Sequence, residues 1–556
     1  MPLHLSRCSR ARPIPPDRKP TISDSNPSLL DRVGRSSVAG RTALVDDGGS
    51  WSYADLAAEA AVWRDRLAEA RCGAGERVAY LVRPGRSHVA AQLGIWAGGA
   101  TAVPLALTHP RRELEYVLDD ARPRVMVVDS SLPGADDLAA SATARRVEVV
   151  ALPPPHPPSP HGDSPLGGPP RLRAPAGPAL IIYTSGTTGR PKGVLTTHRN
   201  VAAQITALTT AWGWTADDRI LHTLPLHHIH GVVNALACAL WSGAACEFGS
   251  GAPVATWDRL ASGKITLFMS VPTVYTRLIR AWDEAPAAAR RRWSRGASRL
   301  RLMVSGSAAL PVATLERWRE ITGHTLLERY GMTEIGMALS NPLRGERRPS
   351  HVGLPLPGVE ARIVDDGGRP VAPGEQGEIE VRGPQVFREY WGRPGETAAS
   401  FRGGWFRTGD EACLGEGGYY RILGRRSVDI VKTGGYKVSA LEVEELYRTN
   451  PRIRDLAVVG VPHPEWGEQL RAAWVPAGEG DASADAAALR AWGKERLAPY
   501  KVPHSFMRVP ALPRNAMGKV QKAAVSRMLM SAETGPTPSQ PGSGDSARPP
   551  SQKEPT

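Results

Sequence analysis

The stretch ALIIYTSGTTGRPKG, residues 179–193, sets the expectation for both fold and chemistry. Its first five residues, ALIIY, form a short apolar run typical of a buried β-strand. The rest is rich in glycine and hydroxyl side chains and carries Lys192, a composition that lets the backbone approach a phosphate closely. It does not follow the Walker pattern G-x-x-x-x-G-K-[ST]. Because α/β proteins bind ligands at the carboxyl ends of strands, we interpret it as a phosphate-binding loop rather than a plain solvent loop.

Short apolar runs alternate with helical patterns over much of the chain. The runs RVAYLV (77–82), RVMVV (124–128) and RVEVVAL (146–152) are typical of buried strands. The segment YADLAAEAAVWRDRLAEA (53–70) has apolar residues at helical spacing. This alternation predicts an α/β fold with largely parallel sheets.

The pattern changes after about residue 354. Short strands with Gly and Pro turns, such as VEARIVDDGGRPV and GEIEVRG, predict a small β subdomain. A compact region with its own strand and helix signals follows Arg425. We therefore predict a large N-terminal domain, residues 24–424, and a small α+β C-terminal domain, residues 425–531, with the boundary at 424–429.

Three segments are too rich in Pro, Gly or polar residues to bury much apolar surface: 1–23, 152–178 and 532–556. We expect the two ends to be disordered and the middle segment to form a surface loop. The N-terminal segment also carries Arg7, Arg10 and Arg12 before its first acidic residue, Asp17, as transit peptides do. It predicts import into the mitochondrial matrix, with a disordered tail on a cytoplasmic protein as the alternative.

The composition restricts the class of protein. The net charge is +14, but the basic residues are spread along the chain and no nucleic-acid-binding motif accompanies them, so we expect no nucleic-acid partner. Attraction of small anions explains this charge equally well. The apolar runs are interrupted by Gly, Pro and Gln, which argues against a membrane span. Five isolated cysteines indicate a reducing compartment. The sequence gives no indication of the oligomeric state.

Several motifs follow the phosphate-binding loop in a fixed order. They are YTSGTTGRPKG (183–193), YGMTE (330–334), WFRTGD (405–410), the pair Gly424-Arg425, and PRNAMGK (513–519). This set resembles the signature of the acyl-adenylate-forming superfamily, which includes acyl-CoA synthetases, over residues 28–530. The resemblance implies that a carboxylic acid attacks the α-phosphate of ATP, and that coenzyme A then takes the acyl group. The carboxylate and the ATP phosphates are both anions, so their approach requires neutralisation of charge. This requirement explains the lysine, arginine and hydroxyl side chains in the motifs.

The resemblance implies a role for each motif. The β- and γ-phosphates are held by Thr184, Ser185, Gly186, Thr187, Thr188, Gly189, Arg190, Pro191 and Lys192. Thr333 donates to the α-phosphate, and Glu334 binds Mg²⁺. Asp410 accepts from the ribose hydroxyls and Arg425 assists at the ribose or phosphate.

The resemblance also implies a moving C-terminal domain. Lys519 reaches from that domain to the attacking carboxylate and the α-phosphate, although alone it would be read as a surface lysine. The domain then swings about residues 425–429, where no pivot residue is evident. Gly434 and Gly435 are implied to line the channel for coenzyme A, with a plain hairpin turn as the alternative.

The acyl site departs from the pattern for fatty or aryl acids. Arg329 replaces a usually small residue and His230 a usually apolar one, while Ser307 adds a hydroxyl. A buried arginine needs an anion, so we expect these three residues to bind the second carboxylate of a short dicarboxylic acid. Alternatively, Arg329 turns away and pairs with Glu328 or another acidic residue. No fourth ligand accompanies His227, His228 and His230, which argues against a metal site there.

ERYGMTE (328–334) and LPLHHIHG (224–231) resemble the malonate–CoA ligases, particularly the mitochondrial type of animals. That resemblance implies formation of malonyl-CoA, AMP and pyrophosphate, and tolerance of methylmalonate as a second acid. The alternatives are a CoA ligase for short- or medium-chain monocarboxylic acids, an enzyme that loads an acyl carrier protein, and a catalytically silent adenylate-binding protein. The last would be expected to lack some of the motif residues.

Overall fold

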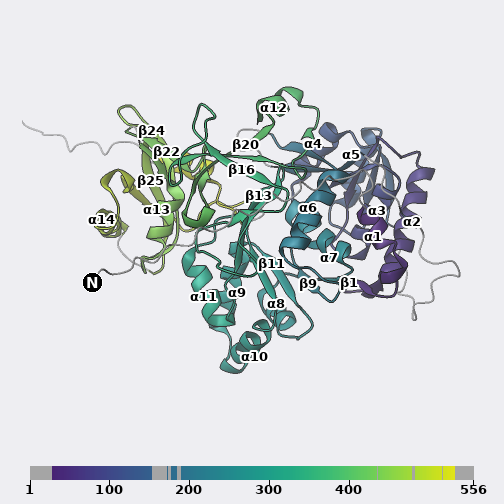
Figure 1. Ribbon diagram of the computed structural model, residues 1–556. Helices are drawn as coiled ribbons and strands as arrows, with labels where there is room; N and C mark the ends of the chain where they lie inside the picture. The colour runs from purple at the N-terminus through teal and green to yellow at the C-terminus, as the bar shows by residue number, and fades with distance from the viewer. Residues whose placement is uncertain are drawn as a thin grey trace, which may run out of the picture.

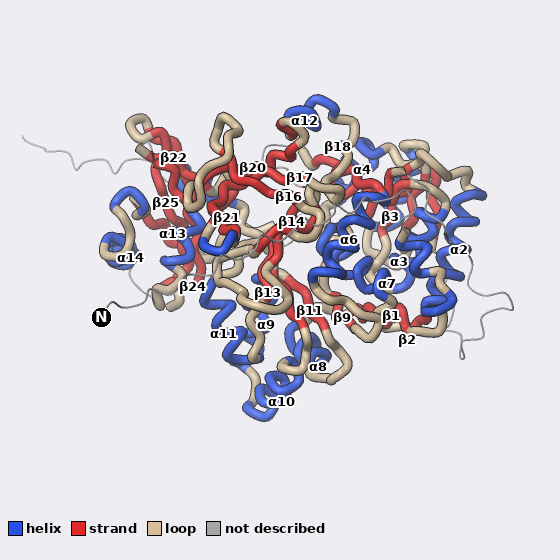
Figure 2. Tube along the Cα trace, viewed as in Figure 1, coloured by secondary structure: helices blue, strands red, loops and turns tan. Residues whose placement is uncertain are grey.

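A computed structural model of the chain describes residues 28–152, 172, 177–184, 190–434, 436–478, 482–515 and 518–531. Two large sheets form the N-terminal domain, a small sheet lies beside them, and a separate sheet forms the C-terminal domain (Figure 1). Figure 2 shows these sheets in red, with helices between and around them. Among the described helices, none combines the length and apolar character that a membrane crossing requires.

The first large sheet has seven strands in the order β18-β8-β7-β4-β3-β5-β6. Its strands are β3 (Arg77–Leu81), β4 (Thr101–Pro104), β5 (Val125–Val128), β6 (Glu148–Ala151), β7 (Pro178–Thr184), β8 (Lys192–Thr197) and β18 (Glu389–Tyr390). Strands β3 to β7 are parallel, whereas β8 and β18 pair in the antiparallel sense. The phosphate-binding loop therefore joins the antiparallel pair β7 and β8.

The second large sheet has nine strands in the order β15-β14-β13-β12-β11-β9-β10-β1-β2. They are β1 (Thr42–Asp46), β2 (Gly49–Ser52), β9 (Arg219–His222), β10 (Ala245–Phe248), β11 (Leu267–Ser270), β12 (Leu302–Ser305), β13 (Leu327–Met332), β14 (Gly336–Ser340) and β15 (Leu354–Pro355). The six central strands are parallel and the edges are antiparallel. Parallel strands buried on both faces explain the continuous apolar runs.

Helices cover both sheets and fill the space between them. They are α1 (Leu29–Val33), α2 (Tyr53–Glu69), α3 (Arg86–Ala97), α4 (Arg111–Ala121), α5 (Ala135–Ala144), α6 (His198–Ala211), α7 (Cys238–Ser242), α8 (Pro253–Leu260), α9 (Pro272–Glu284), α10 (Ala287–Ala297) and α11 (Val312–Thr322). Short 3₁₀ and π segments are η1 (Ser36–Val38) and η2 (His230–Ala237). The main core combines residues of both sheets with α2, α3 and α6. Outer cores lie under α4 and α5 and under α8 to α11.

The small sheet and the C-terminal sheet follow in sequence. The small sheet contains β16 (Glu360–Val364), β17 (Gln376–Arg382), β19 (Phe401–Arg402), β20 (Trp405–Leu414) and β21 (Tyr420–Arg425), with α12 (Pro394–Ala399) and η3 (Glu416–Gly418) nearby in the chain. The C-terminal domain contains β22 (Ile430–Thr433), β23 (Tyr436–Ser439), β24 (Ile453–His463), β25 (Gly467–Pro476) and β26 (Ser505–Arg508), with α13 (Ala440–Tyr447), α14 (Ala482–Lys494), η4 (Pro499–Lys501) and α15 (Lys522–Ser531). Only four residues, 426–429, separate β21 from β22.

The α/β class, the large domain with its β subdomain and the small C-terminal domain are confirmed. Two details differ from expectation. Strand β6 was expected to be buried, but it is the edge strand of its sheet and is partly exposed. Leu172 lies in the Pro/Gly-rich stretch 152–178 yet is buried in the main core, so that stretch packs at one point at least. Segments 1–23, 153–171 and 532–556 lie outside the described residues.

The contact between α2 and α3 yields a stability prediction. A Cβ added at Gly94 of α3 would lie 2.3 Å from Cβ of Trp63 and 2.8 Å from the carbonyl oxygen of Ala60, both on α2. We expect Gly94→Ala to lower the free energy of unfolding by about 1–3 kcal/mol, because the helices must move apart. Chemical denaturation measures this change.

Gly98→Ala is the matched control. At Gly98 the nearest atom to an added Cβ is 3.5 Å away and the backbone is in the right-handed helical region, so this substitution should be neutral or slightly stabilising. Equal stability of the two variants would contradict the tight α2–α3 contact.

Candidate active site

Asp410 of β20 is the point where three of the sequence motifs meet. Tyr330 of β13 donates its hydroxyl to Oδ2 of Asp410 at 2.5 Å. Nε of Arg425, the register partner of Asp410 on β21, lies 3.0 Å from Oδ1. The large nine-stranded sheet, the small sheet and the last residue before the inter-domain link are thereby connected through one carboxylate.

The surroundings of Asp410 fix its position and balance its charge. Burial raises the pKa of this carboxyl, while the charge of Arg425 and the hydroxyl of Tyr330 act in the opposite direction. The backbone is held as well, because the amide of Asp410 donates to the hydroxyl of Thr408 at 3.1 Å, and Arg425 donates to the carbonyl of Thr408 at 2.6 Å. The result is a rigid acceptor suited to a ligand hydroxyl.

Glu334 lies in the turn between β13 and β14 and is buried. Tyr390 donates its hydroxyl to Oε1 of Glu334 at 2.9 Å. Burial raises the pKa of this carboxyl, and the Tyr390 hydroxyl and the Arg425 charge oppose that rise. Its neighbour Thr333 is half-buried in the same turn. The turn is tight because a Cβ on Gly331 would lie 2.0 Å from the carbonyl oxygen of Gly336.

Glu334 is a single buried carboxylate, which is a suitable ligand for Mg²⁺ but does not by itself form a complete metal site. Among the described residues, no group of three or more His, Cys, Asp or Glu side chains could hold a metal ion. Mg²⁺ commonly uses one or two protein carboxylates and takes its other ligands from phosphates and water. Glu334 fits that pattern, whereas the described histidines do not form a site.

The two ends of the phosphate-binding loop are well placed beside Glu334. Lys192 forms an ion pair with Glu396 of α12, and its Nζ lies 5.2 Å from the ring centre of Tyr390. Tyr390 therefore contacts both Lys192 and Glu334. Thr184 is the register partner of Lys192. Ser185, Gly186, Thr187, Thr188 and Gly189 lie outside the described residues.

The far end of the loop is held by Tyr116 of α4. Its hydroxyl donates to the carbonyl of Pro191 at 2.8 Å, and the guanidinium of Arg190 lies 6.0 Å from the centre of its ring. Neither this tyrosine nor Tyr390 and Glu396 belongs to the motifs, so sequence reasoning did not identify them. Their contacts depend on tertiary packing, and no local pattern marks them.

Lys519 comes from the C-terminal domain and lies near these groups. Desolvation by the surrounding protein lowers its pKa, the charges of Arg329 and Arg425 lower it further, and Asp410 opposes them. The residue keeps exposed surface, so it remains accessible to water. An added Cβ on Gly518 would lie 3.4 Å from Oγ1 of Thr273, so the loop rests against the start of α9.

Arg329, Ser307 and His230 lie together, as expected for a common binding site. Nη2 of Arg329 is 3.4 Å from Oγ of Ser307, which is 3.4 Å from Nδ1 of His230. Gly306 allows this arrangement, because a Cβ there would lie 2.5 Å from Cζ of Arg329. Ser307 adopts a left-handed backbone with φ of 69°, which is uncommon for serine and typical of functional sites.

Arg329 forms no ion pair with a carboxylate of the described residues. Burial lowers the pKa of Arg329 to about 9, and its Nε has no hydrogen-bond acceptor. Within the part of the chain that the structure describes, its hydrogen-bond partner is the hydroxyl of Ser307, and Glu328 acts on it through its charge without an ion pair. Burial and then the charge of Arg329 lower the pKa of His230 well below its usual value, so this imidazole is neutral. The site is a buried cation beside two neutral polar groups.

Glu328 does not supply the missing anion. Its Oε1 accepts from the backbone amide of Leu310 at 3.3 Å, and burial raises its pKa to about 8. Adjacent residues of a strand point to opposite faces, so Glu328 and Arg329 attract each other without contact. The alternative in which these two residues form a pair is wrong.

Gly434 lies at the end of β22, in the connection to β23. Gly434 follows β22 with φ of 53°, and its amide donates to the carbonyl of Trp466 at 3.0 Å. Gly435 lies outside the described residues. This geometry is that of the hairpin turn named above as the alternative, and the role in binding coenzyme A stays a prediction.

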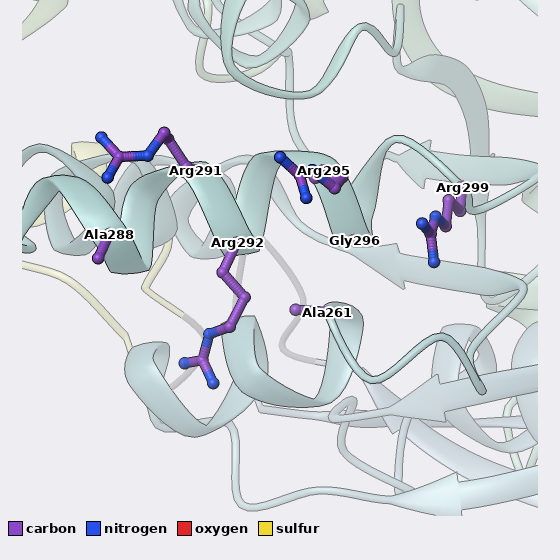
Figure 3. Close-up of a pocket in the computed structure, with 7 residues that line it drawn as sticks. All are labelled: Ala261, Ala288, Arg291, Arg292, Arg295, Gly296 and Arg299. Carbon is purple, nitrogen blue, oxygen red and sulfur yellow. The ribbon is translucent and has the colours of Figure 1, made fainter.

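A surface hollow of about 320 Å³ lies elsewhere, on α10 and the end of α8. It is lined by Ala261, Ala288, Arg291, Arg292, Arg295, Gly296 and Arg299. Figure 3 shows that Arg291 and Arg292 point to opposite sides of the helix. The arginines do not converge on one point, so this hollow does not compete with the site around Asp410.

Comparison with known proteins places the chain among its relatives. A family model described as AMP-binding enzyme matches residues 31–391, and one described as AMP-binding enzyme C-terminal domain matches residues 442–519. The mitochondrial malonate–CoA ligase of Homo sapiens is 45% identical over 535 residues, 88% of this chain and 90% of the relative. The malonate–CoA ligase of Arabidopsis thaliana is 38% identical, covering 83% and 79%.

Solved structures agree with this placement. The ATP-bound MatB of Rhodopseudomonas palustris matches with a TM-score of 0.81 and 34% identity, over 91% of this chain and 99% of that one. The apo form of the same protein matches with a TM-score of 0.72 at the same identity and coverage. With a family model matched over more than half its length, the chain belongs to the family of AMP-binding enzymes.

Proposed function

We propose that the chain joins malonate to coenzyme A in two steps. In the first, a malonate carboxylate attacks the α-phosphorus of ATP, giving malonyl-AMP and pyrophosphate. In the second, the thiol of coenzyme A attacks the acyl carbon, giving malonyl-CoA and AMP. The observation that carries the choice of acid is the buried, unpaired Arg329 beside Ser307 and His230.

A dicarboxylate would supply the anion that the buried guanidinium of Arg329 lacks. Burying a cation without an anion is unfavourable. Removing one partner from a buried ion pair typically costs about 3–5 kcal/mol, because the other charge is then left unpaired. The far carboxylate of malonate would form an ion pair with the guanidinium of Arg329. It would also accept hydrogen bonds from the hydroxyl of Ser307 and from the neutral imidazole of His230. A monocarboxylic acid would leave Arg329 unpaired against an apolar chain, which disfavours the alternative CoA ligase for short- or medium-chain acids.

The names of the relatives support the same substrate. Proteins at 45% identity from Homo sapiens and Bos taurus are named mitochondrial malonate–CoA ligases. The Arabidopsis thaliana relative is also named a malonate–CoA ligase. Those names and the basic N-terminal segment also support a mitochondrial location, for which we propose the matrix. A silent adenylate-binding protein is disfavoured because Lys192, Glu334, Asp410, Arg425 and Lys519 are all present.

Each residue of the site has a task in the first step. Asp410 accepts from the ribose hydroxyls, and Arg425 keeps that carboxylate ionised. Lys519 and Thr333 approach the α-phosphate, where Lys519 offsets the charge of both anions. Residues 184–192 hold the outer phosphates, and Glu334 would hold Mg²⁺, which supplies positive charge to the phosphates when bound. For the second step Lys519 moves away with its domain, and Gly434 and Gly435 line the path of coenzyme A.

Substitution of Arg329 tests the choice of substrate. At about 1.4 kcal/mol per tenfold, Arg329→Ala should lower kcat/KM for malonate by about 10²–10³. The value for butyrate should be unchanged or higher, because the variant removes a cation that penalises apolar acids. The measurement is kcat/KM for both acids, with pyrophosphate release as the signal.

Arg347→Ala provides the control for losing a partly buried arginine. Arg347 donates to the backbone carbonyls of Thr325, Pro342 and Leu343 and takes no part in the acyl site. Its loss should affect stability without changing the ratio between malonate and butyrate. A parallel fall for both acids in Arg329→Ala would make Arg329 structural and remove the main support for malonate.

Substitution of Lys519 tests the two-step scheme. Lys519→Ala should abolish formation of malonyl-AMP, because the two anions then meet without this charge. Conversion of supplied malonyl-AMP and coenzyme A to malonyl-CoA should be spared, since Lys519 has left the site by then. Equal loss of both half-reactions in a folded variant would argue against the moving domain.

A further inference from the structure

The link between the two domains is a closed turn held by three hydrogen bonds. The amides of Val428 and Asp429 donate to the carbonyl of Arg425 at 3.0 and 2.7 Å. The amide of Arg425 donates to Oδ2 of Asp429 at 3.0 Å. All three bonds join the last residue of β21 to the residues just before β22. Backbone rotation at any of residues 426–428 would therefore break them together.

The second oxygen of Asp429 is bound to the C-terminal domain. Nζ of Lys522 lies 2.7 Å from Oδ1 of Asp429 and 2.8 Å from Oε1 of Glu444. The Lys522 side chain is only 8% exposed. Burial opposes its charge, but the two carboxylates outweigh burial and raise the pKa of Lys522. Asp429 is thus shared between a backbone amide of the large domain and a buried lysine of the small one.

Lys522 is directly connected to the loop that carries Lys519. It is the first residue of α15, three positions after Lys519. The loop is closed on itself, because the amide of Gln521 donates to the carbonyl of Pro513 at 2.8 Å and the amide of Asn515 donates to the carbonyl of Lys519 at 2.9 Å. A fixed Lys522 therefore fixes the base of this loop.

We propose that Asp429 and Lys522 are positioning residues for the adenylation step. They keep the turn closed, and the closed turn keeps Lys519 beside Asp410 and Arg329. This inference rests on the proposed two-step function.

Packing at the turn supports the same role for Asp429. A Cβ added to Gly424 would lie 2.5 Å from Cβ of Asp429, so the aspartate lies directly over this glycine. Gly424 has φ of 136°, a conformation that side chains rarely adopt. Opening the turn would take the Arg425 amide away from Oδ2 of Asp429, whereas the contact of Oδ1 with Lys522, which lies on the same side of the turn, would remain. The contact to Arg425 exists in the closed arrangement, and its energy favours that arrangement.

The test compares the half-reactions in variants of Asp429. Asp429→Ala removes both contacts, whereas Asp429→Asn keeps an oxygen for the Arg425 amide but loses the charge that faces Lys522. Malonate-dependent exchange of pyrophosphate into ATP should fall about tenfold to a hundredfold in Asp429→Ala, the range for one hydrogen bond to a charged group, and less in Asp429→Asn. Formation of malonyl-CoA from supplied malonyl-AMP should be unchanged or faster.

Glu442→Gln is the matched control. Glu442 of α13 is paired with Lys501 at 2.8 Å within the C-terminal domain, and this pair does not touch the turn. Its isosteric replacement removes one carboxylate charge, as Asp429→Asn does, and both half-reactions should stay within about twofold of the wild type. Lys522→Arg, which preserves the cation, should retain more exchange activity than Asp429→Ala.

Hydrogen exchange of the hinge gives a readout that needs no activity. Mass spectrometry of the peptide spanning residues 424–430 should show faster exchange in Asp429→Ala, and rates like the wild type in Glu442→Gln. Unchanged exchange, or an equal fall of both half-reactions, overturns the positioning role. If the wild type itself shows no malonate-dependent exchange of pyrophosphate, the proposed function fails instead, and hydrogen exchange at the hinge still decides this inference.

Discussion

Desolvation of charge is the constraint on which the site depends. Asp410, Glu334 and Arg329 are all buried. Burial raises the pKa of the two carboxyls and lowers the pKa of the guanidinium, which in each case favours the neutral form. For Asp410 the nearby cation and the phenol hydroxyl offset this effect. For Arg329 the hydrogen-bond partner among the described residues is the neutral hydroxyl of Ser307, and Glu328 attracts it without forming an ion pair, so the effect of burial prevails. A protein keeps such a group only when another molecule completes it or when folding leaves no alternative.

The cations of the site also repel each other until anions arrive. Arg329 and Arg425 both lower the pKa of Lys519, and Arg329 lowers the pKa of His230. An ATP phosphate or a substrate carboxylate placed among them would relieve this repulsion. In the proposed two-step scheme Lys519 moves with its domain, so its approach would be favoured when anions are bound and disfavoured when the site is empty. Electrostatics therefore couples the domain arrangement to occupancy of the site.

The sequence predicted the fold class and the motif residues well, because each motif is continuous and each buried strand is a continuous apolar run. Strands β3, β5 and β7 fall where expected, and the motif residues Asp410, Arg425 and Lys519 come together. Prediction stopped where tertiary contacts decide. The edge position of β6, the burial of Leu172 and the contacts of Tyr116, Tyr390 and Glu396 depend on which elements become neighbours. The orientation of Glu328 away from Arg329 required the strand register.

The mutual repulsion of Arg329 and Lys519 bears on the kind of acid that the site accepts. Among the charges that lower the pKa of Lys519, that of Arg329 has the largest effect. In the proposed reaction one carboxylate of the substrate faces each cation. A short diacid can place a carboxylate at each of two neighbouring cations, whereas a long diacid must fold back or displace one end. The repulsion that makes the empty site unfavourable is relieved by two carboxylates on one small molecule, and malonate, whose carboxylates are joined by a single carbon, meets that requirement.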